Sequence, residues 1–227
     1  MNIYFLVEGT RSEKKVYPAW MSYLVPQLRR VHHVDHVTEN TYYLFSAQGY
    51  PSILRHIAAA IEDMNTIKAY DYLAICLDAD DLSVEERISE VRQVVNGALL
   101  KAKPVVVVQN RCLETWFLGN RKLCARFPNA HPFIEYKRFY DVSQNDPELM
   151  EKPPAFHSSI SQFHAEYLIR MLREKRLTYS KKAVKVVCQP DYIQELQQRV
   201  QETPHLNTLR TFFDFCEHVR QQLSADS

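Results

Sequence analysis

Glycine is scarce in this chain of 227 residues, which has only four, at positions 9, 49, 97 and 119. Phosphate loops of the GxGxxG and GxxxxGK[ST] types need glycines close together, because their backbone must approach phosphate closely. The four glycines fit neither pattern. We therefore expect neither a Rossmann dinucleotide site nor a Walker-A nucleotide site.

Cysteines and long apolar runs are also limited. The five cysteines are an odd number without a CxxC pair, which indicates buried thiols in a reducing compartment. No stretch approaches the ~18 uncharged apolar residues of a membrane span. The first residues, MNIYFLVEG, reach Glu8 without the basic flank and longer apolar region of a signal peptide. We therefore expect a cytoplasmic protein with no membrane partner.

The formal net charge is +1, so the overall balance points to no partner. Any attraction to a polyanion must come from local patches of charge. The amounts of apolar and charged residues are those of an ordinary globular protein.

The first half of the chain alternates apolar runs with amphipathic stretches. The apolar runs predict strands over residues 3–7, 41–45 and 72–77 and in the VVVV run after Pro104. The stretches between them predict helices over 11–30, from Pro51 through Ile61, and from the Ser83/Glu86 capping box to about Lys101. Pro18 and Pro26 interrupt the first of these patterns, which favours a kink or two shorter helices there. This βαβαβαβ order predicts an α/β fold with a parallel sheet flanked by helices on both faces. Sites in such sheets form beyond the carboxyl ends of the strands.

The second half has a different pattern. We expect helices over 113–127, 160–176, 191–202 and 205–223, with a Pro-rich loop over 143–159. The predicted organisation is an α/β domain over residues 1–125 and a mostly helical C-terminal extension over 126–227 that packs on it.

Acidic residues follow two of the predicted strands. Glu8 comes after the first strand, and Asp78 and Asp80 come after the third. The carboxyl ends of parallel strands lie at one edge, and residues two apart on an extended chain point the same way. Unpaired, three carboxylates would repel and raise each other's pKa values. A divalent cation removes that conflict, and Mg²⁺ favours one or two carboxylates with water and phosphate.

Helix capping is the alternative explanation for an aspartate at this position. An aspartate after a strand often caps the next helix, and we assign that structural role to Asp81, ahead of the helix at Ser83. Three acids in four positions, with Glu8 after another strand, favour a metal site over capping alone.

These motifs resemble those of a known family. FLVEGTRSEKKVYPAW and LDADD, in this order and on these strands, resemble the Toprim domain of topoisomerases, primases, recombination proteins and OLD-type nucleases. Glu8 matches its glutamate after strand one, and Asp78-Ala79-Asp80 matches its DxD after strand three. NRCLETWFLGN, residues 110–120, resembles the NPxxExWLL segment of the RloB-type standalone Toprim proteins, with Arg111 in place of proline. YSKKAVKVV and HLNTLRTFFDF are similar to the C-terminal helical part of those proteins.

The resemblance implies a parallel Toprim (Rossmann-like) sheet and a Mg²⁺-dependent nuclease, with Mn²⁺ as a substitute. Such an enzyme hydrolyses phosphodiester bonds in DNA or RNA, tRNA included, and the RloB-type proteins are associated with defence against phage. Carried over, Asp78 and Asp80 hold the metal, and Glu8 shuttles a proton or completes the ligand set. Glu114 is a candidate ligand of a second metal, with a solvated helix residue as an equal alternative. Glu13 is expected to be a helix-face charge.

A basic segment, RMLREKRLTYSKKAVK, covers residues 170–185 and contains one acid, Glu174. Clustered Lys and Arg side chains can contact a phosphate backbone, and Tyr179 could stack on an unpaired base. A solvated helix face is the alternative. The candidates for nucleic-acid binding are Arg173, Arg176, Lys181 and Lys182.

The HHVDH segment has His32 and His36 at a spacing that can hold zinc on a helix, but a solvated surface patch is favoured there.

Two other functions stay open at this point. One is a nucleotide phosphohydrolase or phosphoryl transferase that uses the same acids. The other is a regulatory or effector subunit, because OLD-type nucleases are often fused or paired with an ATPase and this chain has no ATPase motif. A homodimer is also left open.

Overall fold

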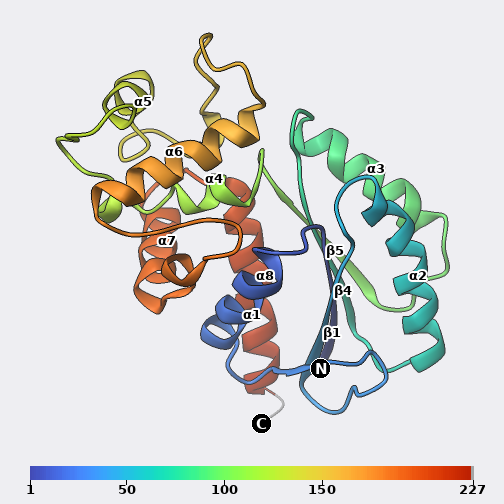
Figure 1. The fold of residues 1–227 in the computed structure, drawn as a ribbon. Coiled ribbons are helices and arrows are strands. Elements are labelled where there is room, and N and C mark those ends of the chain that lie inside the picture. Colours follow the sequence, from blue (N-terminus) through green and yellow to red (C-terminus); the bar gives the residue numbers. More distant parts are fainter. Residues whose placement is uncertain (226–227) are drawn as a thin grey trace. The chain divides into compact units, whose positions relative to one another are not determined.

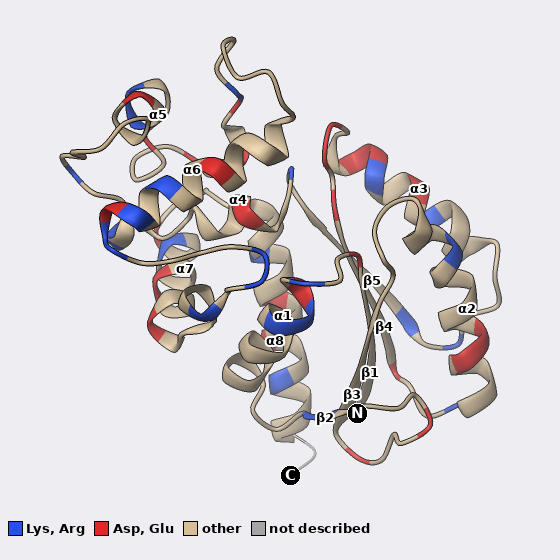
Figure 2. Ribbon diagram, viewed as in Figure 1, with Lys and Arg blue, Asp and Glu red and all other residues tan. Residues whose placement is uncertain are grey.

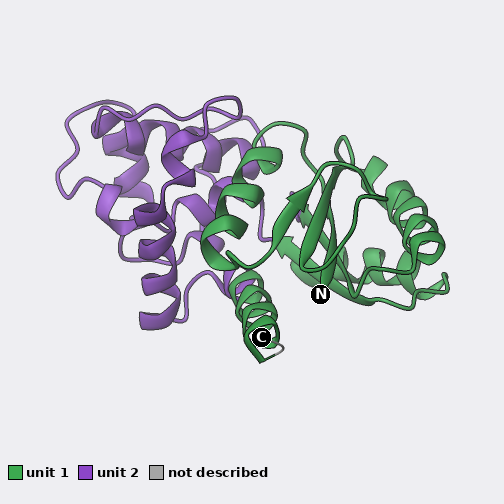
Figure 3. Ribbon diagram, turned by 90° about the horizontal axis from the view of Figure 1, so that it is seen from below, with its two compact units in different colours: residues 1–77, 84–108, 211–227 green, residues 78–83, 109–210 purple. Residues whose placement is uncertain are grey.

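The computed structural model describes residues 1–225. The chain forms two compact units. Unit 1 comprises residues 1–77, residues 84–108 and the chain from Thr211 onward, and unit 2 comprises residues 78–83 and 109–210 (Figure 3). The units do not follow the predicted boundary at residue 125. The chain enters unit 2 at Asp78 and again at Gln109, and most of the last helix, from Thr211 onward, belongs to unit 1.

A five-stranded parallel sheet forms the centre of the α/β fold, which confirms the predicted fold class (Figure 1). The strand order is β2-β3-β1-β4-β5. The strands are β1 (Asn2–Val7), β2 (Arg29–Val31), β3 (Thr41–Ser46), β4 (Tyr72–Asp78) and β5 (Lys103–Gln109). The short strand β2 was not predicted, because it lies in a stretch whose apolar spacing continues that of the preceding helix.

Helices cover both faces of the sheet in unit 1 (Figure 1). They are α1 (Glu13–Leu24), α2 (Ser52–Ile67), α3 (Val84–Asn96) and, from Thr211 onward, α8 (Asn207–Ala225). Helices α2 and α3 lie against each other on one face. On the other face, the Phe5 ring of β1 contacts Tyr17 of α1 and Phe215 of α8, with ring centres 6.4 and 6.3 Å apart.

Helix α1 covers only part of the segment 11–30, where the two prolines favoured a kink or two shorter helices. It ends at Leu24, and Val25 then leaves the helical conformation. Val25 precedes Pro26, and the proline ring disfavours a helical conformation in the residue before it. Pro18, by contrast, is accommodated inside the helix.

Unit 2 consists of helices joined by irregular segments (Figure 3). The predicted helices at 160–176 and 191–202 are confirmed, whereas the one predicted over 113–127 ends at Phe117 and α5 was not predicted. The elements are α4 (Leu113–Phe117), η1 (Arg121–Leu123), α5 (Phe133–Phe139), η2 (Pro147–Leu149), α6 (Ile160–Glu174), η3 (Lys185–Cys188) and α7 (Pro190–Glu202). Within residues 1–225, no helix has the length and apolar character needed to cross a membrane.

Candidate functional site

The sheet has a switch point between β1 and β4. The chain leaves β1 towards α1 on one face, whereas it leaves β4 towards α3 on the opposite face (Figure 1). In open α/β sheets, ligands bind beyond the carboxyl ends of the two strands at such a point. Glu8 directly follows β1, and Asp78 is the last residue of β4. Glu8 and Asp78 therefore lie at the carboxyl ends of the two strands that flank the switch point.

Glu8 belongs to unit 1, where hydrogen bonds hold its backbone at the end of the sheet. Its N–H donates to the Cys76 carbonyl at 3.0 Å, and its carbonyl accepts from the Gly49 N–H at 2.9 Å. The bonds continue the parallel ladder, in which Val7 pairs with Cys76 on one side and with Ser46 on the other. The Glu8 side chain is half-buried.

Glu13 is a second acid near the end of β1. It is buried, and the Ser12 hydroxyl donates to its Oε2 at 2.8 Å. A Cβ on Gly9 would lie 2.0 Å from Oε1 of Glu13, so only glycine leaves room for this carboxylate. The expectation of a helix-face charge is therefore wrong, because the side chain turns inwards against the loop after Glu8. The sequence feature that could have indicated this burial is Gly9, which lies four residues before Glu13 in the first turn of α1.

Asp80 lies in unit 2 in a left-handed conformation, with φ of 52°. Strand β4 ends at Asp78, so the extended-chain argument that Asp78 and Asp80 point the same way does not hold. Asp80 is held instead by specific bonds. Its N–H donates to the Arg111 carbonyl at 2.8 Å, and its Oδ1 accepts from the Ser161 hydroxyl at 3.0 Å. Ser161 is a residue that the sequence did not indicate.

Arg111 also has a left-handed backbone, with φ of 69°. Its guanidinium donates to the Asp80 carbonyl and pairs with Glu151, both at 3.3 Å. Proline, which the resembled pattern has here, holds φ near about −65° and could not adopt this conformation. Two bonded non-glycine residues at positive φ are a local strain of the kind that gathers at functional sites.

Glu114 on α4 is buried, with 2% of the residue exposed, so the alternative of a solvated helix residue is wrong. Its Oε1 accepts a hydrogen bond from the Tyr179 hydroxyl at 2.9 Å. Tyr179 is itself buried, with its ring edge against Phe117. Burial, and then the Glu114 carboxylate, raise the pKa of Tyr179 well above its ordinary value. The interpretation of Tyr179 as a base-stacking residue is therefore wrong.

The thiol of Cys112, just before α4, lies near the carboxylates of both Asp78 and Glu114. Its thiol is buried, and burial raises its pKa well above the ordinary value. The negative charges of Glu114 and Asp78 raise it further. Both carboxylates thus act on one thiol, while Asp80 bonds to the neighbouring Arg111. Unit 2 therefore gathers Asp78, Asp80 and Glu114 around residues 110–114.

The oxygen chemistry of Asp78 and Asp80 fits Mg²⁺, which prefers hard oxygen ligands and often binds only one or two protein carboxylates. The Ser161 bond uses one of the about four lone-pair positions of the Asp80 carboxylate. Among residues 1–225, no group of three or more His, Cys, Asp or Glu side chains is arranged to hold a metal. The larger predicted ligand set of Glu8, Asp78, Asp80 and Glu114 stays a prediction.

The histidine segment is an exposed turn between β2 and β3. Residues 32–36 are not helical, so the spacing of His32 and His36 places them on no common helix face. The rings that do approach each other are those of His33 and His36, with centres 4.7 Å apart.

The basic segment begins on α6 and continues into irregular chain before η3 (Figure 2). Arg170 pairs with Glu166 on the same helix at 2.6 Å. The four predicted nucleic-acid-binding residues are exposed, as contact with a polyanion requires, and their role stays a prediction; they are Arg173, Arg176, Lys181 and Lys182.

Comparisons with known proteins identify no relative. No protein-family model matches the chain, and neither a curated protein nor a solved structure is significantly similar to it. The resemblance to Toprim proteins rests on the motifs alone.

Proposed function

We propose that this protein is a Mg²⁺-dependent nuclease that hydrolyses phosphodiester bonds in DNA or RNA. The main support is the position of Glu8 and Asp78 at the carboxyl ends of β1 and β4, the strands at the switch point of the sheet. A role in defence against phage, action on tRNA, a partner ATPase and a cytoplasmic location belong to the same proposal, and they rest on the sequence.

In this proposal Asp78 and Asp80 hold the metal, which when bound neutralises phosphate charge and activates water. Asp80 keeps its carboxylate oriented through the Ser161 hydroxyl and its backbone fixed through Arg111. Glu8 accepts a proton from the attacking water at a carboxylate oxygen, or returns one to the leaving oxygen. The exposed side chains of the basic segment contact backbone phosphates.

Cleavage assays with charge-neutralising variants test this proposal. Single-stranded DNA, plasmid and tRNA are incubated with the protein in Mg²⁺, in Mn²⁺ or in EDTA. We expect Asp78→Asn, Asp80→Asn and Glu8→Gln each to slow cleavage about 100-fold or more, since general acid–base catalysis alone contributes about 10²–10⁴-fold. Asp81→Asn is the matched control, because Asp81 is exposed and directly follows Asp80.

The outcomes separate this function from its alternatives. Cleavage that persists in both Asp78→Asn and Glu8→Gln would contradict the assignment of the acids. Hydrolysis of mononucleotides alone, lost in Asp78→Asn, would identify a nucleotide phosphohydrolase. A wild-type protein that hydrolyses none of these substrates, with either metal, would favour the regulatory subunit.

A further inference from the structure

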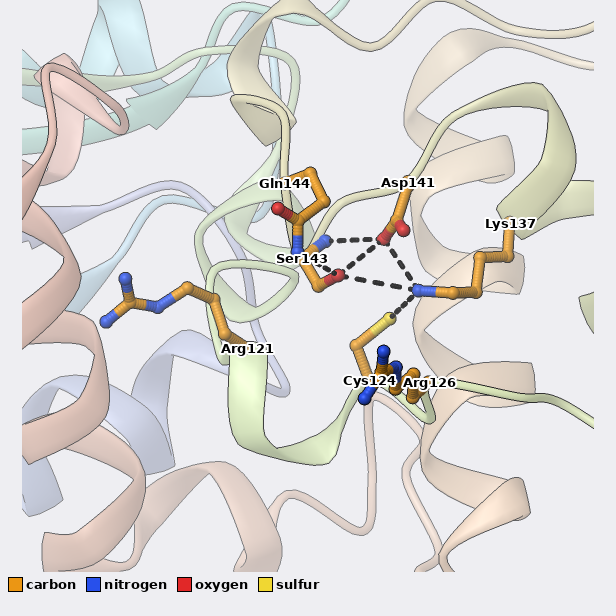
Figure 4. Close-up of a pocket in the computed structure, with 7 residues that line it drawn as sticks. All are labelled: Arg121, Cys124, Arg126, Lys137, Asp141, Ser143 and Gln144. Carbon is orange, nitrogen blue, oxygen red and sulfur yellow. Dashed lines mark hydrogen bonds and ion pairs between the residues drawn. The ribbon is translucent and has the colours of Figure 1, made fainter.

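Unit 2 contains a cavity of about 670 Å³ whose lining carries three basic side chains and one carboxylate (Figure 4). The volume lies within the about 300–1,000 Å³ of small-molecule sites. None of the acids of the proposed nuclease site lines it. The lining residues are Arg121, Cys124, Arg126, Lys137, Asp141, Ser143 and Gln144.

One part of the lining is a closed network of hydrogen bonds around Asp141 (Figure 4). The Lys137 Nζ donates to Oδ1 of Asp141 at 2.7 Å, and the Ser143 N–H and hydroxyl donate to the same oxygen at 3.0 and 2.6 Å. Burial acts to raise the pKa of Asp141, but these bonds lower it below its ordinary value. Lys137 and Asp141 therefore form a fixed, internally neutralised pair.

The remaining cations of the lining differ in how their charge is balanced. Arg121 pairs with Glu195 at 2.9 Å and with Glu202 at 2.8 Å. Arg126 is exposed and forms no ion pair with any residue between 1 and 225. Its guanidinium lies 5.3 Å from the centre of the Phe127 ring. Among the cations of the lining, Arg126 is therefore the one that no carboxylate of residues 1–225 neutralises.

The aromatic ring beside the Arg126 guanidinium is exposed to solvent, because 77% of Phe127 is exposed. An exposed aromatic ring has a face on which an unpaired base can stack. An arginine beside an exposed aromatic ring matches one nucleotide unit, because the cation binds phosphate and the ring stacks on the base.

The segment that carries Arg126 and Phe127 is bonded to the basic segment. Backbone N–H groups of Asn129 and Ala130 donate to the Glu174 carboxylate at 3.2 and 2.7 Å. Glu174 is the last residue of α6, and the exposed Lys175 directly follows it. The cavity residues and the exposed cations after α6 therefore lie on segments that are joined by hydrogen bonds.

We propose that this cavity binds a phosphate group of single-stranded nucleic acid, with Arg126 on the phosphate and Phe127 stacked on the adjacent base. This inference rests on the substrate class of the proposed function. The cavity would give the nucleic-acid strand a contact point that involves none of the proposed catalytic acids.

Binding measured without cleavage tests the inference. Fluorescence anisotropy follows a labelled oligothymidylate on the Asp78→Asn protein in EDTA, over a range of salt concentrations. We expect Arg126→Ala to weaken binding and to reduce the slope of log affinity against log salt by ~0.7, the value for one phosphate contact on a single strand. We expect Phe127→Ala to weaken binding about fivefold or more, from the loss of one stacked base.

Matched controls come from the same unit. Arg138→Ala removes another exposed arginine, and Leu149→Ala truncates another exposed apolar side chain. Both are expected to bind the oligonucleotide within about twofold of the parent protein, as surface substitutions away from a site usually have small effects.

Three outcomes would overturn the inference. One is that Arg126→Ala and Phe127→Ala bind as tightly as these controls. Another is that the protein binds AMP in a parallel titration but not the oligonucleotide, which would assign the cavity to free nucleotides. The third is that the protein binds neither. Loss of binding in both variants, in a protein that cleaves nothing, would support the cavity while contradicting the nuclease proposal.

Discussion

The two units bury different kinds of side chain. In unit 1 aromatic rings such as Phe5, Tyr17 and Phe215 form the core, and the buried charged residues are Glu13 and Arg87. In unit 2 more charged groups are buried, and they hydrogen-bond segments that lie far apart in the chain. They are Glu114, Asp146, Glu148, Glu195 and Arg199. Apolar burial stabilises regular elements with a periodic pattern, whereas buried polar bonds can hold irregular chain that has no such pattern.

Arg199 offers the strongest test of this difference. Its guanidinium donates to the carbonyls of Gly119, Val142 and Asn145 at 3.1, 2.7 and 2.7 Å. We expect Arg199→Met to lower the free energy of unfolding by about 3–5 kcal/mol, because each buried carbonyl left without a donor costs about 1–3 kcal/mol. Urea unfolding followed by circular dichroism measures the change.

The matched change in unit 1 is Ile57→Met, at a fully buried apolar position of α2. A swap that conserves volume usually costs less than about 1.5 kcal/mol. If Arg199→Met costs no more than Ile57→Met, buried polar bonds do not hold unit 2 together.

Glu148 makes the stability of unit 2 depend on pH. Its carboxylate accepts from the N–H and the hydroxyl of Thr208, and burial raises its pKa from 4.5 to about 7. The folded state thus binds this proton more tightly than the unfolded state. The stability that the group contributes is complete below pH 4.5 and is lost as the pH rises through about 7.

We expect the unfolding free energy of wild type to fall by about 2–3 kcal/mol more than that of Glu148→Gln between pH 5 and pH 8. Glu62→Gln, at an exposed position of α2, is the control and should keep the wild-type dependence. A pH dependence that Glu148→Gln leaves unaltered would argue against this assignment.

The glycines provide the smallest contrast. A Cβ on Gly119 in unit 2 would lie 2.4 Å from Leu206 and 2.8 Å from the Trp116 carbonyl. We expect Gly119→Ala to lower the melting temperature, at a cost of about 1–3 kcal/mol from overpacking. Gly97→Ala in unit 1 should stay within about 0.5 kcal/mol of wild type, since its Cβ would lie no closer than 3.4 Å to any atom. Equal melting temperatures for the two variants would show that unit 2 adapts to the added methyl group.

The same difference explains which elements could be predicted. The strands of unit 1 could be identified because apolar runs end where polar residues begin, as at Asp78. Helix α3 begins directly after Ser83, as its capping pattern predicts. In unit 2, α4 ends early and α5 has no clear apolar period, so neither was predicted correctly.

For the candidate site, the sequence indicated the acids but not their surroundings. The burial of Glu114 depends on Tyr179, which lies 65 positions away in the chain. The left-handed conformation of Asp80 accompanies its bonds to Arg111 and Ser161, and no local pattern encodes these contacts. The burial and conformation of such side chains depend on partners far away in the chain, so neighbouring residues in the sequence do not predict them.

Helix α8 also determines when one face of the sheet is fully covered during synthesis. Its rings contact Phe5, Tyr17 and Tyr72, which are made long before α8 itself. The part of this face that α8 covers therefore stays exposed on the ribosome until residues 211–225 emerge, after the whole of unit 2. The nascent chain is expected to expose this apolar surface until α8 is made, and such surfaces are prone to aggregation and bind chaperones.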